Sequence, residues 1–155
     1  YTKDCKSFYP SSILGVASMK NMINKEILKI ALNTQNLSNL SNCTHSSKLR
    51  NSYCGDEIKI YMNLKNGKVI DFKYEGESCI YSQASASLLA KTIKNKNINL
   101  IKELIDKANK GFQDKNNKPI NKQWKSFLKL MNKNNLDRKN CLLLPLKATL
   151  KALKD

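Results

Sequence analysis

Two neighbouring segments alternate apolar and polar residues, which is the pattern of a half-buried β-strand. In residues 56–65 the apolar members are Ile58, Ile60, Met62 and Leu64, and in residues 68–75 they are Ile70, Phe72 and Tyr74. Asn66-Gly67 separates the two segments, and this pair favours a type I′ turn because both residues tolerate positive φ. The sequence therefore predicts a β-hairpin with one buried face.

Apolar residues at helical spacing predict further elements on both sides of the hairpin. We expect helices over about 20–32, 80–91, 98–111, 120–132 and 140–153. In the helix after the hairpin, the predicted inner stripe consists of Ile80, Ala84, Ser87, Leu88 and Lys91. Residues 33–52 are rich in Asn, Ser and Thr and are expected to form a long loop. The order of elements predicts an α+β fold in which a small antiparallel β-sheet packs against several α-helices.

The length of 155 residues suits one domain. We expect residues 1–19 to form an N-terminal arm or extension and residues 20–155 to form a single domain. No apolar stretch approaches the roughly 20 residues that a membrane-spanning helix needs, so the sequence favours a protein without a membrane span.

The chain is strongly basic, with 28 Lys and Arg against 12 Asp and Glu and a net charge of +16. Such a charge can indicate nucleic-acid binding. However, Arg50 and Arg138 are the only arginines, and bidentate recognition of phosphates and bases favours Arg over Lys. A solvated lysine-rich surface is therefore the favoured interpretation, with a nucleic-acid binder as the alternative.

The five cysteines lack the dense, even spacing of a disulfide scaffold. Reduced thiols in a reducing compartment, the cytoplasm or an organelle matrix, are the expected state. Three of them stand at junctions between predicted elements: Cys54 before the hairpin, Cys79 between hairpin and helix, and Cys141 at the start of the last helix. A helix N-terminus lowers a thiol pKa and favours the thiolate, which is both a metal ligand and a nucleophile.

Asp56 stands two residues after Cys54, with Gly55 between them, so one short loop can present a sulfur and a carboxylate oxygen. Three thiolates and a carboxylate would complete a tetrahedral zinc site. His45 is an alternative fourth ligand, and a buried cysteine is often only a small apolar side chain. Cys5 and Cys43 lie away from such junctions and are expected to be free thiols.

Two stretches of the sequence resemble the IscU/NifU N-terminal family of iron–sulfur cluster assembly proteins. They are CGDEIKIYMNLKNGKVIDFKYEGESCIYSQASASLLAKTIKNK and RKNCLLLPLKATLKAL. Two features resemble the SufU branch of this family. One is the extra segment at about 112–134. The other is Asn140, because IscU scaffolds have a histidine at this position directly before the third cysteine, here Cys141. Arg138 matches the arginine that stands three residues before the third cysteine in that branch.

The resemblance implies an IscU/SufU-like fold and a zinc ion held by Cys54, Asp56, Cys79 and Cys141. It further implies that Cys54 accepts sulfur from a cysteine desulfurase and passes it toward downstream iron–sulfur assembly or acceptor proteins. The alternative is a scaffold that assembles a transient 2Fe–2S cluster on the same cysteines. Whether the chain is a zinc-dependent sulfurtransferase or a non-enzymatic scaffold stays open.

Functions of other classes are less well supported. A purely structural zinc domain would use the same ligands and would simply unfold without Cys54. A hydrolytic zinc enzyme is disfavoured, because three thiolates leave the metal electron-rich and no general base stands nearby.

Overall fold

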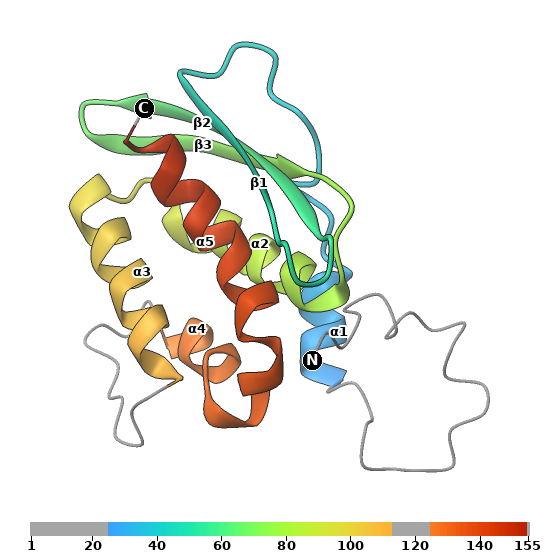
Figure 1. The fold of residues 1–155 in the computed structure, drawn as a ribbon. Coiled ribbons are helices and arrows are strands. Elements are labelled where there is room, and N and C mark those ends of the chain that lie inside the picture. The colour runs from blue at the N-terminus through green and yellow to red at the C-terminus, as the bar shows by residue number, and fades with distance from the viewer. Residues whose placement is uncertain (1–24, 113–124, 155) are drawn as a thin grey trace.

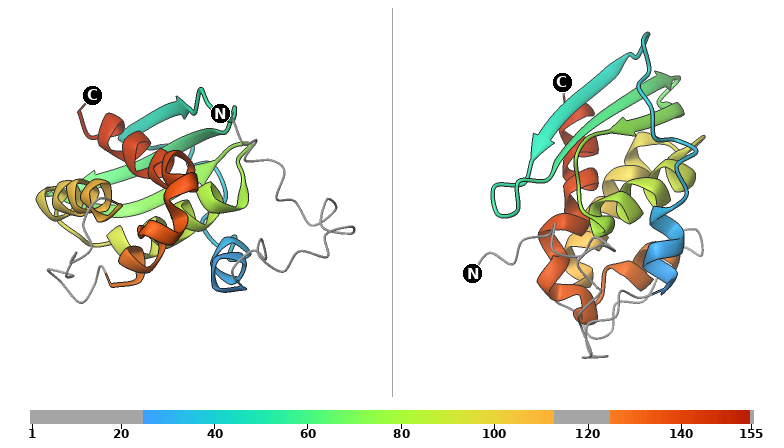
Figure 2. Two further views of the ribbon diagram at one scale, coloured as in Figure 1. Left: turned by 60° about the horizontal axis from the view of Figure 1, so that its bottom comes forward. Right: turned by 90° about the vertical axis from the view of Figure 1, so that its right-hand side faces the viewer.

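The computed structural model describes residues 25–112 and 125–154. Its elements in chain order are α1 (Lys25–Ala31), β1 (His45–Arg50), β2 (Glu57–Lys65), β3 (Lys68–Glu75), α2 (Ile80–Ile93), α3 (Ile98–Gly111), α4 (Lys125–Leu130), the 3-10 helix η5 (Lys133–Arg138) and α5 (Lys139–Ala152). The strands form one antiparallel sheet in the order β1-β2-β3. The helices gather on one face of this sheet (Figures 1 and 2), which confirms the predicted α+β fold.

The predicted hairpin is confirmed. Strands β2 and β3 pair antiparallel, and both turn residues, Asn66 and Gly67, have positive φ. The inner face of the hairpin carries the buried side chains Ile58, Ile60, Met62, Phe72 and Tyr74. These residues pack against the helices and form the sheet side of the core.

Ile70, which the sequence assigned to the inner face of the hairpin, does not lie on that face. Asn63 pairs with Asp71, but the next residue, Leu64, pairs with Val69, so Ile70 is an extra residue in a β-bulge. The bulge reverses the alternation of side chains beyond it. Val69 is therefore fully buried, whereas Ile70 is 42% exposed. The prediction that Ile70 faces the core was wrong for this reason.

Residues 45–50, which the sequence assigned to a long loop, form the edge strand β1. The strand pairs with β2 from His45↔Met62 to Arg50↔Glu57. Its buried position is occupied by Ser47, whose hydroxyl donates to the carbonyl of Ala148 in α5. Because a serine fills the core position, the segment lacks the apolar alternation that reveals a strand.

Helix α2 runs through the middle of the helical layer and contacts α1, α5, α4 and the sheet. Ala84 and Ser87 of the predicted inner stripe are buried, but Lys91 is exposed and Leu89 and Ile93 are buried instead. The helix is covered on several sides, so a single-stripe pattern does not describe it. The small residues of the stretch ASAS (84–87) allow this close packing.

The helical segment at the C-terminal end begins before residue 140, where the sequence predicted the last helix to start. The sequence predicted no helix between 132 and 140, but residues 133–138 form η5, which leads directly into α5. The predicted arm at 1–19 and residues 113–124 of the predicted insertion lie outside the described residues, as does the start of the first predicted helix. No helix of the described segments is both long and apolar enough to cross a membrane.

Candidate metal centre

The loop that joins β1 to β2 carries Cys54 and Asp56, and Asn51 closes it. The Asn51 backbone N–H donates to Asp56 O at 2.7 Å, and the Gly55 N–H donates to Asn51 O at 2.8 Å. The Asn51 side chain also accepts from the Tyr53 N–H at 3.0 Å. Gly55 has a φ of +74°, a conformation that glycine adopts without strain. These bonds fix the loop on which the sulfur and the carboxylate lie.

The fold brings three of the predicted ligands together. The ligand atoms of Cys54, Asp56 and Cys141 all lie within 4.8 Å of one another. Cys54 Sγ is 3.9 Å from Cys141 Sγ. Two sulfurs bound to one tetrahedral zinc at about 2.3 Å each would lie about 3.8 Å apart. The spacing of the two sulfurs therefore fits a shared zinc ion.

Cys79 lies beside this group but outside it. It occupies the N-cap of α2, and its Sγ is 3.9 Å from Ser82 Oγ, which in turn is 3.1 Å from Asp56 Oδ2. The negative charge of Asp56 acts directly on the Cys79 thiol. Cys79 is thus a neighbour of the three grouped ligands through Asp56 and Ser82.

Asp56 is fully buried, and its two oxygens differ in their surroundings. Oδ2 accepts a hydrogen bond from Ser82 Oγ. Oδ1 is also buried, and within the described residues no hydrogen-bond donor reaches it. A buried carboxylate oxygen without a donor is costly unless a cation or another donor compensates it. The donor set and this oxygen both suit a metal ion such as zinc.

The pKa of the Cys79 thiol is not lowered, although the residue stands at a helix N-terminus. Burial is the main cause that raises its pKa to about 12. The Asp56 carboxylate acts in the same direction, and the backbone N–H groups of Ser82 and Tyr81 act in the opposite direction. The expectation that the helix start favours the thiolate was therefore wrong for Cys79 in the metal-free protein. Ligation by Cys79 requires that the incoming metal displace its proton.

Arg138 is buried immediately before α5, and its guanidinium lies 5.6 Å from the centroid of the Tyr81 ring. Tyr81 follows Cys79 by two residues. Burial raises the pKa of Tyr81, and the positive charge of Arg138 opposes that shift. Arg138 is therefore a buried cation whose charge acts on Tyr81, two residues along the chain from Cys79.

The remaining sequence candidates lie elsewhere or need a change of state. His45 is on β1, where Nδ1 is hydrogen-bonded with Thr44 Oγ1, and it is not part of the grouped ligands. Cys43 is a half-buried free thiol, and Cys5 lies outside the described residues. Cys141 is disulfide-bonded, contrary to the expected reduced state, so metal binding through it requires prior reduction.

The sequence reasoning missed two residues of the centre, Ser82 and Asn51. Ser82 stands one helical turn after Cys79, which is a signal that it faces the same way. Asn51 stands three residues before Cys54, in a position where asparagine commonly closes a tight loop. Neither signal predicts which atom the side chain contacts.

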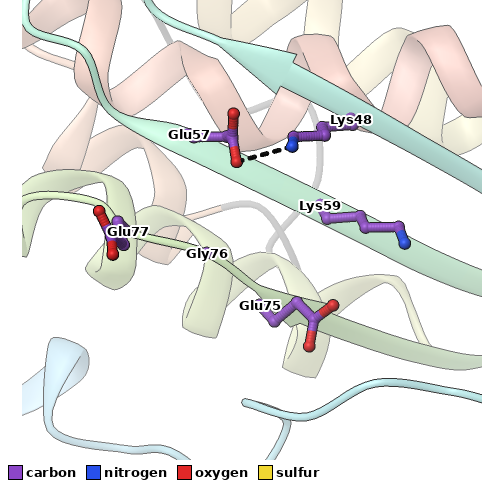
Figure 3. Close-up of a pocket in the computed structure, with 6 residues that line it drawn as sticks. All are labelled: Lys48, Glu57, Lys59, Glu75, Gly76 and Glu77. Atoms are coloured by element: carbon purple, nitrogen blue, oxygen red, sulfur yellow. Dashed lines mark ion pairs between the residues drawn. The ribbon is translucent and has the colours of Figure 1, made fainter.

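A charged pocket on the outer face of the sheet adjoins this region (Figure 3). It is lined by Lys48, Glu57, Lys59, Glu75, Gly76 and Glu77. Its ion pair between Lys48 Nζ and Glu57 Oε1, at 2.9 Å, joins exposed side chains and contributes little to stability. We therefore assign the candidate site to the cysteines and Asp56 rather than to this pocket.

Gly76 connects this pocket to the metal centre by fixing the path of the chain. It has a φ of +143°, and a Cβ at this position would lie 2.2 Å from Glu57 O. The chain beyond it returns along the backbone next to Asp56, where the Glu57 N–H donates to Glu77 O at 2.8 Å. Only glycine allows the approach that brings Cys79 next to Asp56.

Comparison with solved structures places the fold among NifU-like proteins. The N-terminal part of a nitrogen-fixing NifU-like protein from Brucella abortus superposes with a TM-score of 0.72 at 23% identity, covering 84% of this chain and 91% of the other. A putative iron–sulfur cluster assembly scaffold protein for the SUF system from Fervidobacterium islandicum gives 0.72 at 25% identity, covering 84% and 96%.

Sequence relatives agree with the fold. The iron–sulfur cluster assembly scaffold protein IscU of Thermotoga maritima is 37% identical over 91 residues, which are 59% of this chain and 64% of the relative. The zinc-dependent sulfurtransferase SufU of Bacillus subtilis is 46% identical over 50 residues, 32% of this chain and 34% of the relative. The chain thus covers less than two thirds of either relative. Residues 22–124 match the family model of the NifU-like N-terminal domain, and the chain belongs to this family.

Proposed function

We propose that this protein works in iron–sulfur cluster assembly as a zinc-binding sulfur acceptor. The observation that carries the proposal is the buried Asp56 carboxylate, whose Oδ1 lies without a hydrogen-bond donor among the described residues, beside the sulfurs of Cys54 and Cys141. A relative that shares 46% identity over 50 residues is a zinc-dependent sulfurtransferase.

The residues that would hold zinc are Cys54, Asp56, Cys79 and Cys141. When bound, zinc keeps cysteine ligands deprotonated at neutral pH and therefore ready as nucleophiles. Asp56 supplies the one hard oxygen donor among softer sulfurs. We infer that Arg138, a buried cation whose charge acts on Tyr81 two residues after Cys79, offsets part of the negative charge of the ligand set.

Exposure favours Cys54 as the sulfur acceptor. Its side chain is partly exposed, whereas Cys79 and Cys141 are 1% and 2% exposed. Tyr53, the residue before Cys54 in the chain, has a side chain that is 65% exposed. A persulfide presented by another protein can therefore approach Cys54 more readily than the two buried cysteines.

The sulfur transfer is a thiol–persulfide exchange. The Cys54 thiolate attacks the outer sulfur of a persulfide on a cysteine desulfurase, and a new S–S bond forms as the old one breaks. The electron pair of the broken bond leaves with the donor cysteine as a thiolate. Cys54 becomes the persulfide, so the exchange needs no external oxidant or reductant. Downstream assembly or acceptor proteins then take the sulfur.

The alternative is that the same cysteines assemble a transient 2Fe–2S cluster. It is favoured by the relative that is 37% identical over 91 residues, an assembly scaffold. Thiolate ligands suit iron–sulfur clusters as well as zinc. Anaerobic incubation with iron and sulfide distinguishes the two: a stoichiometric visible chromophore supports the scaffold, and its absence supports the sulfur acceptor.

The main test follows one sulfur atom. Reduced, zinc-loaded protein is mixed with a cysteine desulfurase and cysteine, and intact mass is recorded after alkylation. We expect the added sulfur on Cys54 and none in Cys54→Ala. Cys43→Ala is the matched control, because Cys43 is the other partly exposed described cysteine. Equal labelling of Cys54→Ala and the unmodified protein would refute Cys54 as the acceptor.

A further inference from the structure

A single buried hydroxyl connects three parts of the candidate metal centre. Ser82 Oγ lies 3.1 Å from Asp56 Oδ2, 2.8 Å from the carbonyl oxygen of Cys141 and 3.9 Å from Cys79 Sγ. Ser82 is fully buried, so water does not compete for these contacts. A serine hydroxyl has one proton, which it donates to either Asp56 or Cys141 at any moment.

Pro145 explains why the Cys141 carbonyl accepts from a side chain. Residue 145 is the one whose backbone N–H would bond to Cys141 O in a regular α-helix, and proline has no N–H. The carbonyl is therefore deprived of its usual helical donor. Ser82, on the neighbouring helix α2, supplies a proton in its place.

Ser85 provides an internal comparison one turn further along α2. It is also fully buried, and its hydroxyl donates to the next carbonyl of α5, Leu142 O, at 2.6 Å. Ser82 and Ser85 thus each donate from α2 to a carbonyl of α5. Of the two serines, Ser82 also contacts Asp56. Two features therefore distinguish Ser82 from Ser85: the contact with the carboxylate, and an acceptor carbonyl, Cys141 O, that lacks a helical N–H donor because residue 145 is proline.

We propose that Ser82 is a positioning residue of the metal centre, which holds Asp56 by Oδ2 so that Oδ1 is the atom presented to the metal. The two environments of the carboxylate carry this assignment, because Oδ2 has a donor and Oδ1 lies buried without one among the described residues. The inference deepens the proposed function and rests on it. Asp56 then binds through one oxygen only, with its orientation fixed by α2.

Sharing of the hydroxyl makes this support partial. When the Ser82 proton turns to Cys141 O, Asp56 Oδ2 loses this donor. The helix that carries Cys141 and the carboxylate ligand are thereby linked through one proton. A partly held oxygen ligand is the member of the set that yields first when a sulfur ligand has to be exposed or replaced.

The test compares Ser82→Ala with Ser85→Ala in the reduced 155-residue chain. Zinc affinity is measured by competition with a chromophoric chelator, and cobalt(II) replaces zinc as a spectroscopic probe. We expect Ser82→Ala to bind zinc about 10–100-fold more weakly, the usual loss for a residue that orients a ligand. We expect Ser85→Ala to bind zinc as the unmodified protein does. The stability of each variant without metal is measured separately, because only Ser82→Ala removes the donor of a carbonyl whose helical partner is a proline.

A double-mutant cycle separates positioning from general structural damage. In an Asp56→Ala background, Ser82→Ala should cause no further loss of zinc affinity, since no carboxylate remains to be held. The cobalt d–d bands should shift in Ser82→Ala and keep their wild-type position in Ser85→Ala. Two results would overturn the inference. One is an equal zinc affinity of the two serine variants. The other is a loss of zinc affinity from Ser82→Ala in the Asp56→Ala background that is as large as in the unmodified protein. An unmodified protein that binds no zinc would instead refute the proposed function.

Discussion

Replacement of Asp56 by alanine separates a metal ligand from a structural carboxylate. In the zinc-free protein the substitution removes a buried oxygen, Oδ1, that has no donor among the described residues, which relieves about 1–3 kcal/mol. It also removes the charged hydrogen bond from Ser82, which costs about 1.5–3 kcal/mol. The two contributions nearly cancel. We expect the free energy of unfolding without zinc to change by less than about 1 kcal/mol.

With zinc the same substitution should be costly. Three sulfur ligands remain, so zinc stays bound but more weakly. A loss of about 100-fold in affinity lowers the zinc-dependent stabilisation by about 2.7 kcal/mol when zinc is in large excess. The zinc-loaded protein should therefore lose far more stability than the zinc-free protein does.

The assay is urea denaturation of reduced protein, once with a chelator and once with excess zinc. Asp137→Ala is the control, because Asp137 is an exposed aspartate four residues before Cys141. We expect the control to unfold like the unmodified protein under both conditions. A loss of similar size with and without zinc would show that Asp56 has a structural role, and the assignment of Oδ1 as a ligand atom would fail.

Three further predictions address the cysteines and the chain path. Cys5→Ser and Cys43→Ser should leave the zinc content of the purified protein unchanged, as determined by metal analysis. Zinc binding should release the proton of Cys79, because its pKa of about 12 keeps the thiol protonated at neutral pH. Calorimetry in buffers of different ionisation enthalpy should therefore show one fewer released proton in Cys79→Ala. For the same reason, zinc affinity should rise as the pH rises toward the pKa of Cys79. Gly76→Ala should lower the free energy of unfolding by at least about 2 kcal/mol in urea, because its Cβ would collide with Glu57 O; an unchanged midpoint would contradict this.

The parts of the fold that could be predicted are those in which one apolar side chain follows another at a regular period. The β2–β3 hairpin met this condition, and its Asn66-Gly67 turn was visible in two residues. Strand β1 did not, since Ser47 fills its buried position. Ile70 could not be placed either, because a bulge depends on pairing with the other strand and leaves no mark on composition.

The candidate site likewise has some residues that the sequence could predict and others that it could not. Sequence reasoning could name Cys54 and Cys141 from their positions at element junctions and Asp56 from its place two residues after Cys54. The fold groups the ligand atoms of these three residues. Sequence reasoning could not anticipate that burial outweighs the helix start at Cys79, since burial depends on the packing of distant segments. It also could not find Ser82, whose importance comes from a contact across two helices.

The shared hydroxyl of Ser82 leads to a last prediction, which concerns stability without metal. Pro145→Ala restores a backbone N–H opposite Cys141 O, so that carbonyl regains its helical donor. In the unmodified protein, Ser82→Ala leaves this carbonyl unsatisfied, a loss of about 1–3 kcal/mol. In the Pro145→Ala background that part of the loss should disappear, and denaturation of the four proteins measures the coupling directly. The same loss from Ser82→Ala in both backgrounds would mean that the proline does not determine where the hydroxyl points. If the coupling is present, the proline in α5 is the reason that one serine serves both the helix and the carboxylate.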